Sequence, residues 1–120
     1  MNPLNLALRF VLELIALGAL GWWGWTLSES WWRWLAAMGM VAAAAFVWGT
    51  FAVPEDPSRG GQGLVQVPGV VRLAIELLVF AGGAYALRAV GRPGLAIAFG
   101  ALVLAHYAWS HERLAWLLKQ

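Results

Sequence analysis

The sequence predicts an all-α integral membrane protein, a four-helix bundle made of two helical hairpins that repeat each other. Three observations predict this class. Hydrophobic residues make up 62% of the 120 residues and charged residues only 12%, whereas a soluble domain has roughly 25% charged residues. Two long stretches carry no charge, and the two halves of the chain are similar in sequence. We expect a single domain over residues 1–120.

The composition also excludes several other classes of protein. Eight basic and six acidic side chains are too few to cover the surface that a soluble domain presents to water. So hydrophobic a chain is not disordered. The absence of Cys excludes a disulfide scaffold and a Cys-ligated metal site. A net charge of only +2 gives no support to nucleic-acid binding.

The first predicted hairpin consists of spans at residues 4–26 and 34–53. Residues 34–54 contain no charged residue, and a helix of about 20 residues crosses the hydrocarbon layer. The first span carries Arg9 and Glu13 near its start. A cleaved signal peptide would also explain Arg9 before an apolar run, but a similar stretch recurs later in the chain, where no signal peptide lies.

The second predicted hairpin consists of spans at residues 67–88 and 93–111. Arg72 and Glu76 lie near the start of the first, and the second is free of acidic and basic residues from 93 to 110. Pro68 and Pro93 suit the first turn of a helix. The polar Pro/Gly-rich residues 54–63 separate the hairpins. No strand is expected, because no segment alternates with a period of two.

The internal repeat joins residues 1–53 to residues 64–120. The segment LALRFVLEL at 6–14 resembles GVVRLAIEL at 69–77. Each half has two spans, so both halves enter the membrane from the same side. The repeat is therefore parallel, with a pseudo-twofold axis along the membrane normal.

Basic and aromatic residues predict an orientation. Five Lys and Arg residues belong to the side that holds both termini and three to the other, which favours cytoplasmic termini. A cluster of Trp residues around the first loop suits an aromatic belt at the outer interface; an aromatic ligand cage is the alternative. The belt residues are Trp22, Trp23, Trp25, Trp31, Trp32 and Trp34.

The charged residues within the spans are the candidate site. Arg9 and Glu13 are one turn apart, as are Arg72 and Glu76, so each pair shares a helix face. Charges in hydrocarbon persist when they are paired or line a wet cavity. Because Arg before Glu opposes the helix dipole, we expect crossed pairs, Arg9 with Glu76 and Arg72 with Glu13. A structural role and an ion or proton path both remain open.

His106 in the last span is expected at the depth of these Glu residues, hydrogen-bonded to one of their carboxylates. His106 and His111 are the only His residues, and their spacing puts them on different helix faces, so they would not bind one metal ion together. We expect no metal and no cofactor. Residues 114–118 are expected to lie along the interface.

Small residues at helical spacing predict close helix packing, and the sequence does not decide whether that packing is within the chain or in a homodimer. These residues are Gly18, Gly21, Ala45, Gly49, Ala81 and Ala84. There is no nucleophile elbow, phosphate loop or zinc-protease motif, so we expect no enzyme. Two functions remain: an accessory packing subunit or homo-oligomer, or a small proton-coupled transporter that uses the intramembrane Glu residues. The expected partners are the lipid bilayer and either a second copy or a membrane-complex partner.

Three segments carry a family resemblance: LALRFVLEL at 6–14, VWGTF at 47–51 ahead of Pro54, and RLAIELLVF at 72–80. Together they resemble the YrdB-like family of small bacterial membrane proteins. The resemblance covers nearly the whole chain. It implies four helices in the bacterial inner membrane and no assigned activity. Carried over by motif, it points to Arg9, Glu13, Trp48, Arg72 and Glu76; the Trp-rich first loop is heavier than is usual in that family.

Overall fold

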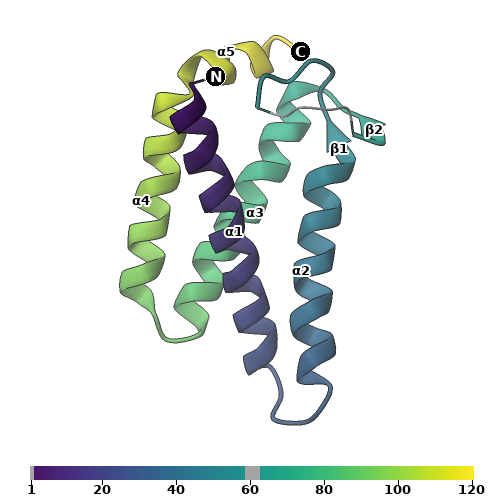
Figure 1. Ribbon diagram of the computed structural model, residues 1–120, viewed down its shortest axis with the longest axis vertical. Coiled ribbons are helices and arrows are strands. Elements are labelled where there is room, and N and C mark those ends of the chain that lie inside the picture. The colour runs from purple at the N-terminus through teal and green to yellow at the C-terminus, as the bar shows by residue number, and fades with distance from the viewer. Residues whose placement is uncertain (1, 59–62) are drawn as a thin grey trace.

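The computed structural model describes residues 2–58 and 63–120, which confirm the all-α prediction. These residues form five helices and two short strands (Figure 1). The helices are α1 (Pro3–Thr26), α2 (Arg33–Thr50), α3 (Gly69–Ala89), α4 (Pro93–Trp109) and α5 (His111–Leu118), and the strands are β1 (Phe51–Ala52) and β2 (Val65–Gln66).

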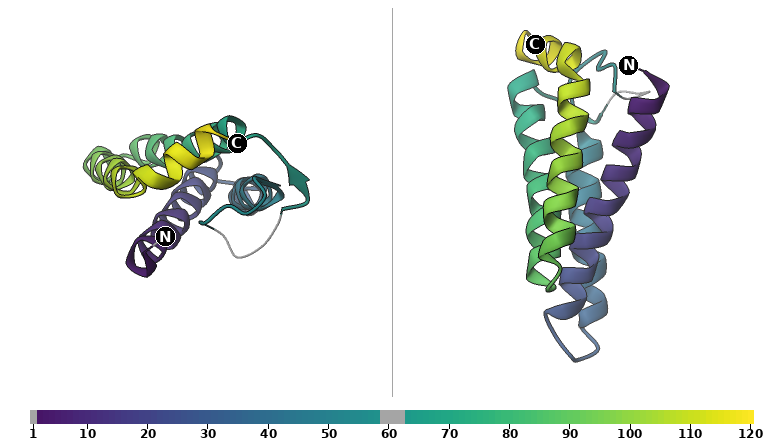
Figure 2. Two further views of the ribbon diagram at one scale, coloured as in Figure 1. Left: turned by 90° about the horizontal axis from the view of Figure 1, so that it is seen from above. Right: turned by 90° about the vertical axis from the view of Figure 1, so that its left-hand side faces the viewer.

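Two antiparallel hairpins, α1–α2 and α3–α4, begin at the same end of the molecule, where α5 and both termini also lie (Figure 1). Helix α1 packs against α2 and α3, and α3 packs against α4. Figures 1 and 2 place α2 and α4 on opposite sides of the α1–α3 pair. The end with the termini is called the terminal end below. The internal repeat itself stays a prediction.

The chain enters and leaves its helices through local signals. Helix α1 starts at Pro3, and the Asn2 side chain accepts a 2.8 Å hydrogen bond from the Leu4 N–H, as an N-cap residue does. Pro93 occupies the first turn of α4, where its missing N–H costs no helical hydrogen bond. The turn between α3 and α4 contains Gly91 at φ 84°, a conformation that favours glycine.

The fourth predicted span is broken. Helix α4 ends at Trp109, and α5 leaves it at an angle of 72°. Three described helices are long and apolar enough to cross a membrane, or four if the bent pair counts as one span. The bend lets α5 cross the terminal end and bury Arg113 and Leu117. If any other residue replaced Gly69, its Cβ would overlap the Leu117 carbonyl. Glycine at this position therefore allows α5 to lie against α3.

The expectation of no strands is wrong at small scale. Strands β1 and β2 pair in parallel over two residues each, and the Val67 N–H donates to the Ala52 carbonyl at 2.9 Å. Two residues are too short to produce a visible alternation. The pairing returns the chain from the end of α2 to the start of α3.

The hydrophobic core lies where α1, α3 and α4 meet. Leu12, Ala16, Phe80 and Phe99 are almost fully buried there. Gly83 allows a close approach, because a Cβ at this position would lie 3.0 Å from the Ala16 Cα. The charged residues described below lie next to this core, toward the terminal end.

Candidate functional site

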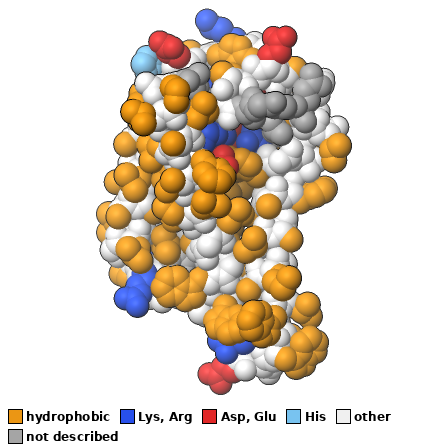
Figure 3. All heavy atoms as spheres, in the orientation of Figure 1, with side chains coloured by type: hydrophobic (Ala, Val, Ile, Leu, Met, Phe, Trp, Pro, Cys, Tyr) orange, Lys and Arg blue, Asp and Glu red, His pale blue; other side chains and the backbone are white. Residues whose placement is uncertain are grey.

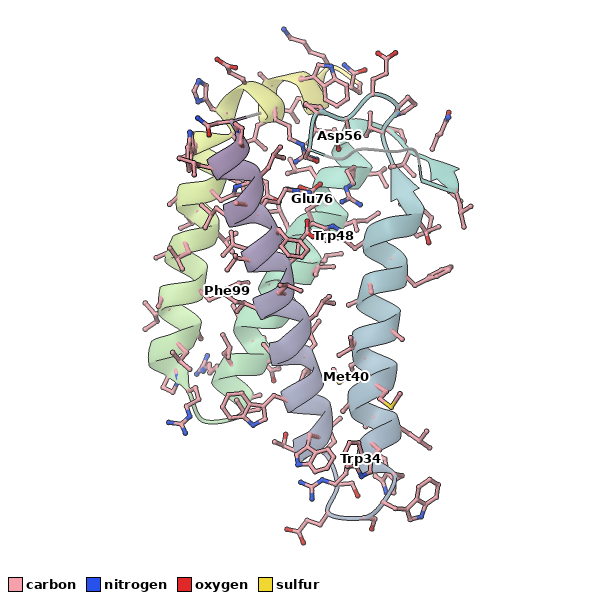
Figure 4. The ribbon with its side chains drawn as sticks, in the orientation of Figure 1. Trp34, Met40, Trp48, Asp56, Glu76 and Phe99 are labelled. Carbon is pink, nitrogen blue, oxygen red and sulfur yellow. The ribbon has the colours of Figure 1, made fainter. Side chains whose placement is uncertain are left out.

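A buried carboxylate, that of Glu76 on α3, is the centre of a cluster of charges near the terminal end (Figure 4). It is 0% exposed. Its oxygens lie 2.9 Å from Arg9 Nη2 on α1, 2.7 Å from Arg72 Nε on α3 and 2.7 Å from Arg113 Nη2 on α5. The Tyr107 hydroxyl on α4 donates to Oε1 at 2.8 Å. One side chain therefore connects four helices.

Arg113 extends the cluster to the segment that follows β1. Its Nε and Nη2 donate to the two oxygens of Asp56 at 2.8 and 2.6 Å, a bidentate pair. Burial alone would raise the pKa of Asp56, but the hydrogen bonds and charge of Arg113 and the hydrogen bonds from Ser58 hold this pKa below its usual value. Burial alone would lower the pKa of Arg113, and Asp56 and Glu76 instead raise it. Both groups are therefore charged near neutral pH.

Arg72 also closes the end of α2. Its Nη1 donates to the carbonyls of Trp48 at 2.5 Å and Phe51 at 2.8 Å, near a helix end where carbonyls lack helical partners. The Trp48 ring centroid lies 4.7 Å from the Arg72 guanidinium carbon and 5.0 Å from that of Arg9. Both distances are within cation–π range. Trp48 is thus the aromatic partner of both guanidinium groups.

Arg9 is the least well satisfied guanidinium of the cluster. Its Nη1 donates to Glu76 at a long 3.3 Å, and its Nε lies 3.5 Å from Glu13 Oε1. Nη2 is 2.9 Å from Glu76, yet the angle is too poor for a hydrogen bond, so this buried nitrogen has no hydrogen-bond partner among the described residues. The charge of Arg9 is compensated, but its donors are not fully used. The Glu13 side chain is 25% exposed.

A polar chain runs from Arg9 toward the start of α5. His106 Nε2 lies 3.5 Å from Arg9 Nη1, and His106 Nδ1 lies 2.7 Å from the Asn5 amide oxygen. The Asn5 amide nitrogen donates to the Ser110 hydroxyl at 2.7 Å. The predicted hydrogen bond from His106 to a Glu carboxylate is therefore wrong, because Asn5 and Arg9 occupy its two nitrogens; the neighbouring Tyr107 reaches Glu76 instead.

The crossed pairing is only half present. Arg9 contacts Glu76 across the α1–α3 interface. Arg72 does not pair with Glu13; its Nε binds Glu76 on its own helix, and its Nη1 binds the end of α2. The expected symmetry fails because the carbonyls at the end of α2 compete for Arg72.

Sequence reasoning missed the members of the cluster that lie outside its repeated pairs. Asp56 belongs to the predicted connector, Arg113 follows the last predicted span, and Tyr107 and Asn5 are ordinary residues of apolar helices. The sequence signal that comes nearest to indicating the Asp56–Arg113 pair is the low number of charged residues. In so apolar a chain, an acidic and a basic side chain at the same end of the molecule are candidates to pair.

The other predicted positions fall into two groups. The Trp residues gather at the end opposite the termini, where Figure 4 labels Trp34; among them, the Trp25 and Trp34 rings pack edge to face at 4.6 Å. Of the small residues, Gly21 and Ala84 pack inside the chain. The others are exposed: Gly18, Ala45, Gly49 and Ala81.

Two cavities lie beside the cluster between α1, α2 and α3. The polar cavity, of about 220 Å³, is lined by Arg9, Glu13, Trp48, Gly49, Ser58 and Arg72. The apolar cavity, of about 210 Å³, is lined by Glu13, Leu17, Ala45, Trp48, Gly49 and Val79. In Figure 3 charged atoms of both signs are visible in a hollow near the terminal end, among hydrophobic side chains.

The charges of the cluster balance. Three guanidinium groups, of Arg9, Arg72 and Arg113, face three carboxyl groups, of Glu13, Asp56 and Glu76. Burying charges is costly unless each is paired and hydrogen-bonded. Five ion pairs join these groups, and the pairs Arg72–Glu76, Arg113–Asp56 and Arg113–Glu76 are also hydrogen bonds. Within the described part of the chain, no group of three or more His, Cys, Asp or Glu residues could hold a metal ion.

Comparison with known proteins gives a family and no activity. A family model described as "Protein of unknown function (DUF2568)" matches residues 7–104. The chain is 42% identical over 120 residues to "Uncharacterized protein YrdB" of Bacillus subtilis (strain 168), an alignment that covers 100% of this chain and 98% of that relative. No solved structure matches the chain.

Proposed function

The chain belongs to the DUF2568 family of proteins of unknown function, as its resemblance to YrdB-like proteins predicts, and from this premise we propose that it is a non-catalytic multi-pass membrane protein. In this proposal it packs against a membrane partner or a second copy of itself. The observation that carries the proposal is the outer face of α2. Among the residues of α2, only Thr50 is buried.

The outer face of α2 has the pattern of a helix-packing surface. Gly39 and Ala43 are exposed and four residues apart, and nothing lies within 4 Å of a Cβ built at Gly39. In membranes, small residues at this spacing let helices approach closely and gain packing energy. Helix α3, by comparison, buries seven residues. A surface on α2 is therefore left for a neighbour.

The charge cluster supports a structural role inside this subunit. Glu76 is enclosed and shared by three guanidinium groups, so it links α1, α3 and α5 into one unit. Removing one partner of such a group leaves an uncompensated buried charge, which is strongly unfavourable. We infer that the cluster holds the terminal end together while α2 makes the external contact.

The mass of the protein in a mild detergent tests this proposal. Size-exclusion chromatography with light scattering should give a protein mass that is a multiple of 13.0 kDa, or a stable complex with a second membrane protein. Gly39→Ile with Ala43→Ile should reduce it to 13.0 kDa, whereas Gly18→Ile, on an exposed face of α1, should not. A wild-type protein that is entirely monomeric and free of other proteins would contradict the proposal.

We also propose that the protein lies in the bacterial inner membrane with both termini in the cytoplasm. The support is the excess of Lys and Arg on the terminal side, five against three. Three of those five, Arg9, Arg72 and Arg113, are engaged with buried carboxylates, so the orientation needs a direct test. Because the chain has no Cys, Ser28→Cys should react with a membrane-impermeant maleimide in intact cells, and Gln120→Cys only after lysis. The reverse labelling pattern would contradict the proposal and place both termini outside the cytoplasm.

A proton-coupled transporter is the second candidate, and the position of Glu13 favours it. Glu13 is 25% exposed and borders both cavities, so one intramembrane carboxyl group remains accessible while Glu76 is closed off. In this case, Glu13→Gln should abolish proton-coupled substrate uptake in reconstituted vesicles. Under the packing proposal, the same substitution leaves the oligomeric mass unchanged.

A further inference from the structure

The polar and apolar cavities are neighbours, and together they are called the path below: its upper part is charged and its lower part is hydrophobic. They share Glu13, Trp48 and Gly49 as lining residues. Trp48 and Gly49 lie in the last turn of α2 and Arg72 in the first turn of α3, the level at which both helices end. Leu17, Ala45 and Val79 continue the path about one to two turns deeper. We propose that this path binds one amphipathic molecule with a zwitterionic phosphate–ammonium head group, its head in the polar cavity and its chain in the apolar cavity.

The donors of the polar cavity suit a phosphate. Arg9 is 2% exposed and lines the cavity, and its Nη2 has no hydrogen-bond partner among the described residues. Arg72 lines the same cavity from α3, and Ser58 contributes a side chain at its edge. Guanidinium groups bind phosphate oxygens through charge-assisted hydrogen bonds. Arg9 and Arg72 therefore bring two guanidinium groups to the wall of the polar cavity, where their charge would attract a phosphate.

The charge balance of the cluster favours a head group that carries an ammonium group as well as a phosphate. The cluster already contains as many carboxylates as guanidinium groups among the described residues, so a purely anionic ligand would add an uncompensated charge. A zwitterion adds none. Glu13, 25% exposed and on the border of both cavities, is the carboxylate placed to receive an ammonium group beside the phosphate.

The size and lining of the two spaces agree with this occupant. A volume of about 220 Å³ is many times the roughly 10–15 Å³ that one water molecule requires, so a small polar head group has room there. The apolar cavity offers Leu17, Ala45 and Val79 to a hydrocarbon chain. An amphiphile in a bilayer holds its head at the interface and its chain below, in the same order as these cavities. The inference rests on the membrane location proposed above and not on the packing role of α2.

Native mass spectrometry of the detergent-purified full chain tests the inference with three added lipids of equal chain length. A phosphoethanolamine lipid should bind at one per chain, ahead of a phosphoglycerol lipid, which is anionic. Glu13→Gln should weaken the phosphoethanolamine lipid at least about tenfold, because it removes the charged acceptor, and should not weaken the phosphoglycerol lipid. A phosphocholine lipid, whose ammonium cannot donate a hydrogen bond, should bind more weakly than phosphoethanolamine.

Matched variants and soluble probes complete the experiment. Ala45→Phe should fill the apolar cavity and displace the lipid. Two control variants should leave binding unchanged: Ala74→Phe, exposed on the other side of α3, and Glu29→Gln, exposed in the first loop. Equal retention of all lipids by the wild type and Glu13→Gln would overturn the inference. So would displacement by soluble phosphoethanolamine or inorganic phosphate at the concentration at which the lipid binds, because an amphiphile would then not be required. A failure of lipid binding with an oligomeric mass as proposed would contradict this inference alone. A monomeric protein that still binds the lipid would contradict the proposed function alone.

Discussion

Replacing Glu76 with Gln should destabilise the protein more than any other single change of one charged group. Gln keeps one oxygen and replaces the other by an NH₂ group. If Oε1 is replaced, the nitrogens of Arg9 and Arg113 that now donate at 3.3 and 2.9 Å would face a donor, while the Tyr107 hydroxyl can turn to accept. Two hydrogen bonds to a charged group are lost, at roughly 1.5–3 kcal/mol each.

The resulting loss in the free energy of unfolding is about 3–5 kcal/mol, the range found when one partner of a buried ion pair is removed. Titration with a denaturing detergent in mixed micelles, followed by circular dichroism, measures it. The control is Glu13→Gln, which removes the same charge from a side chain that is 25% exposed, and it should cost under about 1 kcal/mol. A Glu76→Gln protein within about 1 kcal/mol of the wild type would refute the assignment of Glu76 as the centre of the cluster. If Glu76→Gln does not accumulate, Tyr107→Phe should give a smaller loss of about 1 kcal/mol.

Three further predictions follow from individual contacts. Gly69→Ala should loosen α5 and lower the melting temperature, because the new Cβ would overlap the Leu117 carbonyl. Gly18→Ala, whose new Cβ would have nothing within 4 Å, should leave the melting temperature unchanged or raise it. Equal effects of the two substitutions would contradict the packing of α5 on α3. Asp56→Asn should remove an acid-sensitive part of the stability, because the pKa of Asp56 is lowered in the folded protein. The stability advantage of the wild type over this variant should be constant above about pH 5 and decline as the pH falls below about 4. The midpoints of acid unfolding of the two proteins should therefore differ. An advantage that grows on acidification would contradict this sign. Arg9→Glu combined with Glu76→Arg should not restore stability, since the guanidinium group introduced at position 76 would lie beside those of Arg72 and Arg113; full rescue in a thermal unfolding assay would mean that Arg9 and Glu76 form an isolated pair.

The helices and one pairing of their charged residues could be predicted because long apolar runs follow strong rules of sequence. An uncharged run of about 20 residues has few alternatives to a helix, and the bounds of α1, α2 and α3 lie close to the predicted spans. A charge inside such a run requires a partner, which is why Arg9 and Glu76 could be matched before the structure was known. Glycine and proline at the helix ends set the turns.

The bend at Ser110 and the full membership of the cluster could not be predicted. Nothing in the residues around Ser110 fixes an angle of 72° between α4 and α5; this angle follows from how Leu117 and Arg113 are buried against distant residues. One partner of Arg113 is Asp56, 57 positions away, and no local periodicity joins them. The choice of Arg72 between Glu13 and the end of α2 is likewise a competition that only the three-dimensional arrangement decides.

Distance measurement between α3 and α5 tests most directly whether the charge cluster holds the terminal end together. Because the chain contains no Cys, spin labels can be placed at the exposed positions Val70 and Glu112 in protein reconstituted into lipid nanodiscs. Double electron–electron resonance should give one narrow distance in the otherwise wild-type protein and a broad distribution when Glu76→Gln is added. The same narrow distance in both proteins would contradict the account, because α5 would then be held in place without the carboxylate that links it to α1 and α3.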